Sequence, residues 1–242
     1  NCFYIDKTSF IKEWWDNMDS VTLITRQRRF GKTLTISMLK RFFSIQYYNE
    51  SAIFEHLDIW KYPEYREIMG TYPAMERGLM TGITRVSKES IFSDLNNMEV
   101  VTTTSVKYAD VYGFTEDEVF SALDEYGLSD IKDKVKRWYD GFLFGNSKDI
   151  YNPWSIINLL DKKQLGTYWA NTSANGLIAK LIQEGDRNIK QLFETLLKGE
   201  SIVCEIDEQI IYNQLSINDN AIWSLLLASC LLYTSPSPRD GA

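Results

Sequence analysis

The apolar and polar positions near the start of the chain predict a helix, a buried strand and a second helix. Asp6 and Thr8 are residue types that cap helix starts, and they precede apolar residues at helical spacing, Phe10, Ile11, Trp14 and Trp15. The run Val21–Thr25 is short, apolar and rich in β-branched residues, which is typical of a strand buried in a sheet. A second helical stripe then extends to about Ser44 and comprises Leu34, Met38, Leu39, Phe42 and Phe43.

Further along, the pattern predicts one more strand and then mostly helices. Leu79–Val86 fits a second buried strand, and Ser87 is placed to cap a helix that carries Ile91, Phe92 and Leu95. Later helix starts are signalled by a capping box at Thr115–Glu118, by Ser129, whose helix includes Trp138, and by Asn152, whose predicted buried face is Trp154, Ile156, Ile157 and Leu160. The remaining patterns fit helices at Leu177–Glu184 and Ile189–Lys198 and a small hairpin at Ile202–Leu215.

The loop between the first predicted strand and the second helix has the features of a phosphate-binding loop, or P-loop. It spans Arg26–Thr33 and ends in Gly-Lys-Thr, directly between strand and helix. In such a loop, backbone N–H groups and the positive end of the helix surround phosphates, and Lys32 places a charge on the outer phosphates. Gly31 allows the backbone to approach the ligand closely, and Thr33 is the predicted Mg²⁺ ligand. We therefore expect ATP and Mg²⁺ as cofactors, bound by Arg28, Arg29, Phe30, Gly31, Lys32 and Thr33.

Two features of this loop leave alternatives open. The first glycine of the usual G-x-x-x-x-G-K-[ST] pattern is replaced by Arg26. A Gly-Lys-Thr can open a helix by chance, but the strand and helix on either side favour phosphate binding. Arg28 and Arg29 either contact phosphate or form a solvated basic turn.

Several stretches together resemble the predicted AAA-ATPase-like proteins of bacteria, over residues 1 to about 229. The matching stretches are Tyr4–Thr8, Arg28–Thr33, Thr81–Ser87, Trp138–Gly141 and Tyr151–Ser155. The resemblance implies an α/β fold, with an AAA-type P-loop parallel-sheet core followed by a mostly α-helical lid of winged-helix character. Relatives often carry a PD-(D/E)XK nuclease-like domain beyond this region, and they usually have proline where this chain has Gln27.

The resemblance also implies parts that are not found in this sequence. Such proteins have a strand ending in acidic residues, Walker B, between positions equivalent to Lys32 and Thr84, which holds Mg²⁺ and polarises the attacking water. No such pattern occurs there, so we expect a core shortened at about Pro73–Ala74 and impaired hydrolysis. Ile202–Glu208 has a Walker B-like pattern that ends in Asp207 and Glu208, but it follows the lid. We interpret it as a hairpin strand, and a catalytic role of these two carboxylates is the less favoured alternative.

Other residues of interest have two interpretations each. By resemblance, Thr84 and Arg85 are sensor residues near the γ-phosphate, and the alternative is a helix-capping turn with Ser87. The aromatic residues of Tyr151–Trp154 and Trp138–Tyr139 are interpreted as the core of the lid rather than as ligand-stacking groups.

These elements suggest four regions. We expect a P-loop core at 1–100, a helical lid at 101–165 and a helical extension with a small hairpin at 166–229. From about Cys230 the pattern changes to low complexity, and we expect 230–242 to be a non-native tail. The chain opens without methionine inside a patterned segment, so we expect a fragment.

Charge and cysteine content narrow the function further. A net charge of −7 argues against a surface that follows nucleic acid or anionic lipid throughout. Three cysteines without paired spacing give no disulfide framework or zinc site, and we expect a cytoplasmic protein without a membrane span. The hypotheses are an ATP-binding module, a nucleotide-switched regulatory or interaction module, and nucleic-acid handling through the basic cluster Arg26, Arg28, Arg29, Lys40 and Arg41. AAA-type relatives often assemble, so the resemblance also implies a homo-oligomer.

Overall fold

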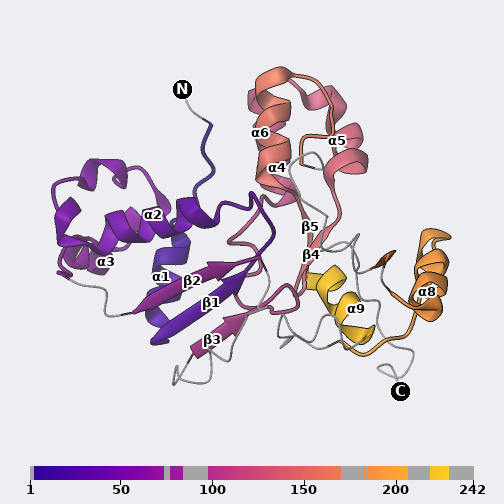
Figure 1. Ribbon diagram of the computed structural model, residues 1–242. Helices are drawn as coiled ribbons and strands as arrows, with labels where there is room; N and C mark the ends of the chain where they lie inside the picture. The colour runs from indigo at the N-terminus through magenta and orange to yellow at the C-terminus, as the bar shows by residue number, and fades with distance from the viewer. Residues whose placement is uncertain are drawn as a thin grey trace, which may run out of the picture.

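A three-stranded parallel sheet forms the centre of the protein. The computed structural model describes residues 3–73, 77–83, 98–169, 182–183, 185–206 and 219–228. Strand β1 (Val21–Thr25) lies between β2 (Gly78–Gly82) and β3 (Met98–Val101) and runs parallel to both (Figure 1). Because parallel strands end at the same edge, the segments that follow β1, β2 and β3 emerge together on one side of the sheet.

Helices pack on the sheet through a core that is rich in aromatic residues. The helices are α1 (Ser9–Asp16), α2 (Lys32–Phe43) and α3 (Pro63–Ile68), with three short 3-10 helices between α2 and α3: η1 (Ile45–Tyr47), η2 (Ser51–Ile53) and η3 (Asp58–Lys61). Phe10, Ile24 and Phe42 are fully buried in this core, and each such side chain contributes about 1.5–3 kcal/mol through burial. The indole Nε1 of Trp14 donates to Thr22 Oγ1 at 3.0 Å, which fixes α1 against β1.

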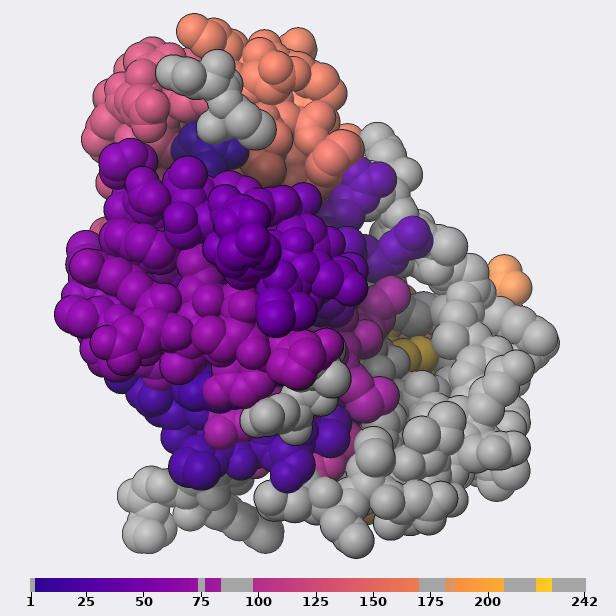
Figure 2. Space-filling model, turned by 90° about the vertical axis from the view of Figure 1, so that its left-hand side faces the viewer, coloured from indigo at the N-terminus to yellow at the C-terminus, as the bar shows by residue number. Residues whose placement is uncertain are grey.

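A second group of elements, the helical lobe, lies against this core. It comprises α4 (Glu116–Glu125), η4 (Ser129–Ile131), α5 (Lys132–Tyr139), the antiparallel pair β4 (Phe142–Phe144) and β5 (Ser147–Ile150), and α6 (Pro153–Lys162). Its own core includes Val119, Leu123, Val135, Ile156 and Leu159. Figure 2 shows the pink and salmon atoms of this lobe next to the purple atoms of residues from α2 to α3.

A third, smaller cluster contains the last described elements. Helices α8 (Arg187–Leu197) and α9 (Asp219–Ala228) pack through Ile189, Ile222, Trp223 and Leu226. In the described part of the chain, no helix combines the length and the apolar character needed to cross a bilayer.

Many predicted elements are confirmed. The strand Val21–Thr25 and the helix that follows it match the sequence prediction, as does the capping box in which Thr115 and Glu118 bond each other's backbone. The Asn152 side chain accepts from Ser155 N at 3.2 Å, so the predicted cap is also confirmed.

Other predictions need correction. The second strand ends at Gly82, whereas β3, β4 and β5 were not predicted. Residues 202–206 are not in a strand, and the rest of the predicted hairpin lies outside the described residues. The helix predicted from Ser87 lies outside the described residues, and so does most of the helix predicted at Leu177–Glu184. Trp138 and Trp154 are 54% and 39% exposed, so only Tyr139 and Tyr151 of the predicted lid aromatics belong to the core.

Candidate functional site

Loop 26–33 makes a tight turn between β1 and α2. Arg29 has φ 66° and Gly31 has φ 81°, both in the left-handed region, and Gly31 is the N-cap residue of α2. Glycine adopts this conformation without steric cost, which explains its place at the point where the loop enters the helix. Between them the Phe30 ring is 1% exposed and packs on Phe142 and Phe144, with centroids 5.0 and 5.6 Å away. The Phe30 ring therefore anchors the second half of the loop.

Lys32 is held across the loop by backbone oxygens. Its Nζ donates to the carbonyl of Arg26 at 2.8 Å and to the carbonyl of Gln27. Burial, together with the charges of Arg28 and Arg26, lowers the pKa of Lys32 to about 8. A cation that is partly desolvated and close to other cations is stabilised when an anion arrives. An anion placed beside Lys32 would therefore favour its charged form.

The start of α2 adds further groups that attract anions. The first N–H groups of a helix have no partner within it, and its N-terminal end carries a partial positive charge. Thr33 is exposed at this end, whereas Thr35 is buried and its N donates to Gly31 O at 3.0 Å. The Thr35 hydroxyl donates to Gly31 O at 3.3 Å, so Thr33 has the more accessible of the two hydroxyls.

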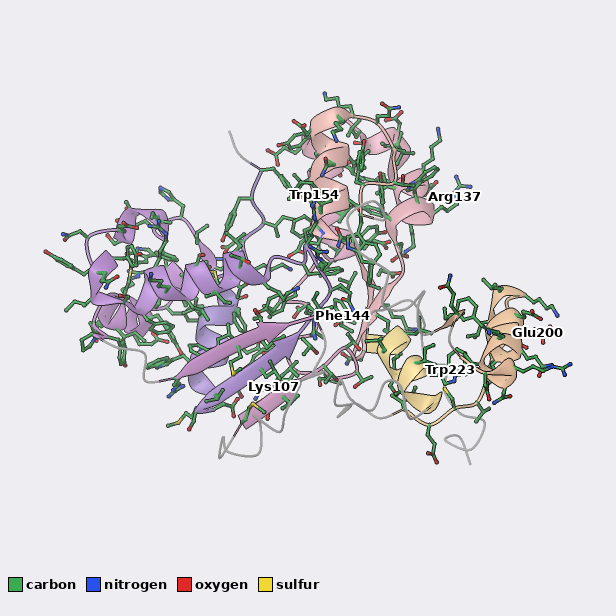
Figure 3. All side chains as sticks on the ribbon, in the orientation of Figure 1. Lys107, Arg137, Phe144, Trp154, Glu200 and Trp223 are labelled. Carbon is green, nitrogen blue, oxygen red and sulfur yellow. The ribbon has the colours of Figure 1, made fainter. Side chains whose placement is uncertain are left out.

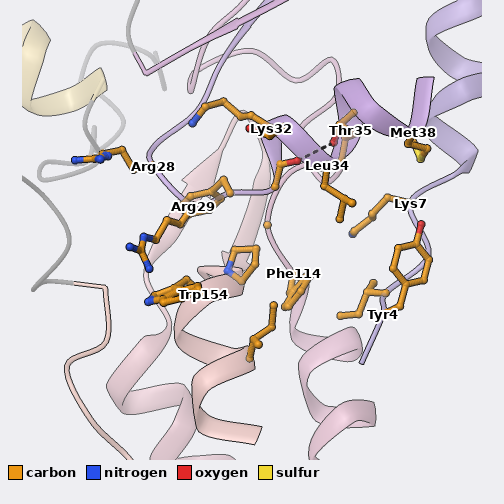
Figure 4. A pocket seen from close by; sticks show the side chains of 18 of the residues that line it. Tyr4, Lys7, Arg28, Arg29, Lys32, Leu34, Thr35, Met38, Phe114 and Trp154 are labelled. Carbon is orange, nitrogen blue, oxygen red and sulfur yellow. Dashed lines mark hydrogen bonds between the residues drawn. The ribbon is translucent and has the colours of Figure 1, made fainter. Parts of the chain in front are cut away.

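A cavity of about 810 Å³ opens beside the loop. Apart from the loop, its walls come from α2, from Ile83 after β2, and from three parts that are more distant in sequence: the segment before α1, the residues before α4, and the start of α6 (Figure 4). Its lining residues include Tyr4, Lys7, Leu34, Met38, Ile83, Phe114, Trp154 and Ile157. The cavity therefore has a basic end at the loop and a mostly apolar end at the helical lobe.

The helical lobe contacts the loop directly. The guanidinium carbon of Arg29 lies 3.9 Å from the centre of the Trp154 ring, in a cation–π contact that Figure 4 displays. The carbonyl of Arg28 accepts from Trp169 Nε1 at 3.2 Å and from Asn152 Nδ2 at 3.5 Å. Residues of loop 26–33 are therefore connected to the start of α6 and to Trp169, which lies beyond its C-terminal end.

The structure brings together six of the predicted site residues. Arg28, Arg29, Phe30, Gly31, Lys32 and Thr33 all line the cavity. Thr84, Arg85, Asp207 and Glu208 lie outside the described residues, although Ile83, next to Thr84, lines the cavity. Four further lining residues were not predicted as site residues: Tyr4, Phe114, Trp154 and Ile157. The spacing of Trp154 and Ile157, three apart and offset from Ile156, Leu159 and Leu160, is a signal that could have revealed a second face on α6.

The predicted basic cluster does not form one surface. Arg26 is 0% exposed, so it cannot contact nucleic acid, and Arg41 forms an ion pair with Glu50. The prediction that Arg26 belongs to a basic surface that binds nucleic acid is therefore wrong.

An acidic cluster lies elsewhere, in the helical lobe. Oxygens of Glu116, Asp140 and Asp149 lie within 4.8 Å of one another, and Lys136 forms ion pairs with all three carboxylates. Burial and the neighbouring Asp149 raise the pKa of Asp140 to about 6. Because Lys136 supplies the positive charge, we interpret this group as structural.

Comparisons with known proteins support the resemblance to predicted AAA-ATPases over the first third of the chain. Residues 1–77 match the AAA-ATPase-like family, described as "Predicted AAA-ATPase". This stretch contains α1, β1, loop 26–33 and α2. The chain is also 30% identical over 108 residues to "Uncharacterized protein in vnfD 5'region" of Azotobacter chroococcum mcd 1. That alignment covers 44% of this chain and 20% of the relative, so the chain spans about a fifth of the relative's length. No solved structure matches the chain.

Proposed function

We propose that this chain binds ATP with Mg²⁺ in the cavity beside loop 26–33. One observation carries the proposal. The chain passes from β1 through a left-handed turn at Gly31 into α2, so the Lys32 ammonium and the N-terminus of α2 lie at one end of a ligand-sized cavity. The match of residues 1–77 to a predicted ATPase family supports it.

Each end of the cavity would hold one part of the nucleotide. At the loop end, the first N–H groups of α2 and the Lys32 ammonium bind the phosphates, and Arg28 and Arg29 assist. Thr33 would hold Mg²⁺, which neutralises charge on the phosphate oxygens when bound. At the lobe end, Tyr4, Phe114 and Trp154 offer ring surfaces for the base and sugar.

We further propose that hydrolysis is impaired in this chain. The described residues that line the cavity include no aspartate or glutamate. Among these described residues, neither a bound metal nor an attacking water would have the acidic partner that ATP hydrolysis uses. Thr84 and Arg85 remain proposed sensor residues, because they follow Ile83 at the cavity wall.

Titration with a fluorescent ATP analogue in the presence of Mg²⁺ tests binding. Lys32→Ala removes charged hydrogen bonds to phosphate, each worth about 1.5–3 kcal/mol, and should weaken ATP by roughly 10–100-fold. Lys40→Ala is the matched control, because Lys40 lies on the same helix, is exposed and does not line the cavity. Equal affinity of the K32A variant and the wild type would exclude the site. Phosphate release above a protein-free blank would overturn the proposal of impaired hydrolysis and would direct attention to Asp207 and Glu208.

A second candidate is a nucleotide-switched regulatory module. The contacts from α6 and Trp169 to Arg28 and Arg29 favour it, because phosphate binding by Arg29 competes with its contact to Trp154. In this case ATP binding should change hydrogen exchange in α6 without turnover. A winged-helix character of the lobe and assembly into a homo-oligomer remain proposals of the same kind.

A further inference from the structure

Arg26 occupies the loop position at which the usual pattern has glycine, and its side chain is buried. It is 0% exposed, although it carries a full positive charge. Burying a guanidinium costs several kcal/mol unless its N–H groups are bonded, so a buried arginine at this position has to be held by specific partners.

The described partners of the Arg26 guanidinium come from three parts of the chain. Nη1 donates to the carbonyls of Thr25 and Thr102, both at 2.8 Å, and Nη2 donates to the carbonyl of Tyr108 at 3.1 Å. Its central carbon lies 4.5 Å from the centre of the Phe144 ring. Figure 3 places Phe144 where the sheet region meets the helical lobe. The guanidinium therefore joins the end of β1 to the segment after β3 and to β4.

The main chain of the same residue holds Lys32. The carbonyl of Arg26 accepts from Lys32 Nζ at 2.8 Å, and the neighbouring Gln27 carbonyl accepts from it too. The residue whose guanidinium is held by these partners thus supplies one of the two oxygens that bind the ammonium, and the next residue supplies the other. A glycine could not supply this link, because it has no side chain.

We propose that Arg26 is the positioning residue of the phosphate site, whose buried guanidinium fixes the loop carbonyls that aim the Lys32 ammonium at the ligand. This inference rests on the proposed function. In the usual pattern the first glycine gives the loop conformational freedom. In this loop, the hydrogen bonds of a buried arginine side chain hold the backbone instead.

A double-mutant cycle tests whether Arg26 acts through Lys32. Arg26→Lys keeps the charge but loses the planar fork that reaches three carbonyls. ATP affinity is measured with Mg²⁺ for the wild type, R26K, K32A and the R26K/K32A double variant, each checked for folding by circular dichroism. R26K should weaken ATP about 5–10-fold when Lys32 is present and less than about 2-fold in the K32A background, because coupled residues are not additive.

Other outcomes separate the possible failures. An equal loss in both backgrounds would mean that Arg26 supports the fold without aiming Lys32, and no loss in either would also overturn the inference. If the wild type binds ATP and K32A does not differ from it, the proposed function fails first. If R26K does not fold, Phe144→Leu replaces it in the cycle, since it removes the ring beneath the guanidinium and leaves Arg26 in place. The same non-additivity with K32A is then expected.

Discussion

The two ends of the cavity are built in different ways. The loop end consists of eight consecutive residues, and its properties come from backbone conformation, a helix terminus and one ammonium group. The lobe end is assembled from side chains as far apart as Tyr4 and Ile157. A site formed by adjacent residues can be recognised in a sequence. A site formed by residues that are far apart in the sequence is harder to predict, because its composition depends on how the helices pack.

The largest expected effect comes from detaching the loop from its anchor. Phe30→Ala removes a buried ring that packs on Phe142 and Phe144, and should lower the free energy of unfolding by about 3–5 kcal/mol. Urea denaturation followed by circular dichroism measures this loss. Tyr48→Ala, at an exposed aromatic residue, is the control and should change stability by less than about 0.5 kcal/mol. Similar values for both variants would show that the loop end does not depend on Phe30.

The same contrast explains what the sequence could predict. Val21–Thr25, the start of α2 and the capping box at Thr115 are set by neighbouring residues, and these predictions are confirmed. Strand β3 has only four residues, Met98–Val101, and is recognised as a strand through its pairing with β1. Trp154 resembles a core aromatic in sequence, yet it faces the cavity because Ile156 and Leu159 take the buried face of α6. Such choices between two faces of a helix are made by tertiary packing.

A smaller effect should distinguish the lobe end from the loop end. Trp154→Ala removes a ring surface worth about 1–1.5 kcal/mol, so ATP should bind roughly 5–10-fold more weakly. Inorganic tripolyphosphate has no base, so the same substitution should weaken its binding by less than about 2-fold if only the loop end binds it. Competition against a fluorescent ATP analogue measures both ligands.

Trp138→Ala is the matched control for this experiment. Trp138 is an exposed tryptophan of the same lobe and does not line the cavity, so its removal should leave both affinities unchanged. If W154A weakened tripolyphosphate as much as ATP, the division of the cavity into two ends would be wrong.

The smallest expected effect concerns the acidic cluster, which lies apart from the cavity. The folded-state pKa of Asp140 is raised to about 6, so the folded state binds a proton more readily than the unfolded chain between about pH 4 and pH 6. Stability therefore falls as pH rises through this interval. Asp140→Asn should remove this dependence and increase stability by about 1 kcal/mol at pH 7.5, with no gain at pH 3.5.

Thermal unfolding at several pH values, compared with Asp133→Asn, measures this effect. Asp133 is an exposed carboxylate on α5, outside the cluster, and its substitution should leave the pH profile as it is. ATP affinity should be the same in D140N and the wild type. If D140N were more stable than the wild type by the same amount at every pH, the raised pKa of Asp140 would not be the cause.

The wide spacing of the cavity walls along the chain has a consequence for ligand-induced stabilisation. A molecule that touches Tyr4, Lys32 and Trp154 at once acts as a cross-link between the first residues, the sheet region and α6. At a concentration 100 times its Kd, such a ligand adds about 2.7 kcal/mol to the stability of the folded chain. This gain should reach α1 and α6 alike, so amides in both helices should exchange more slowly together when the cavity is filled.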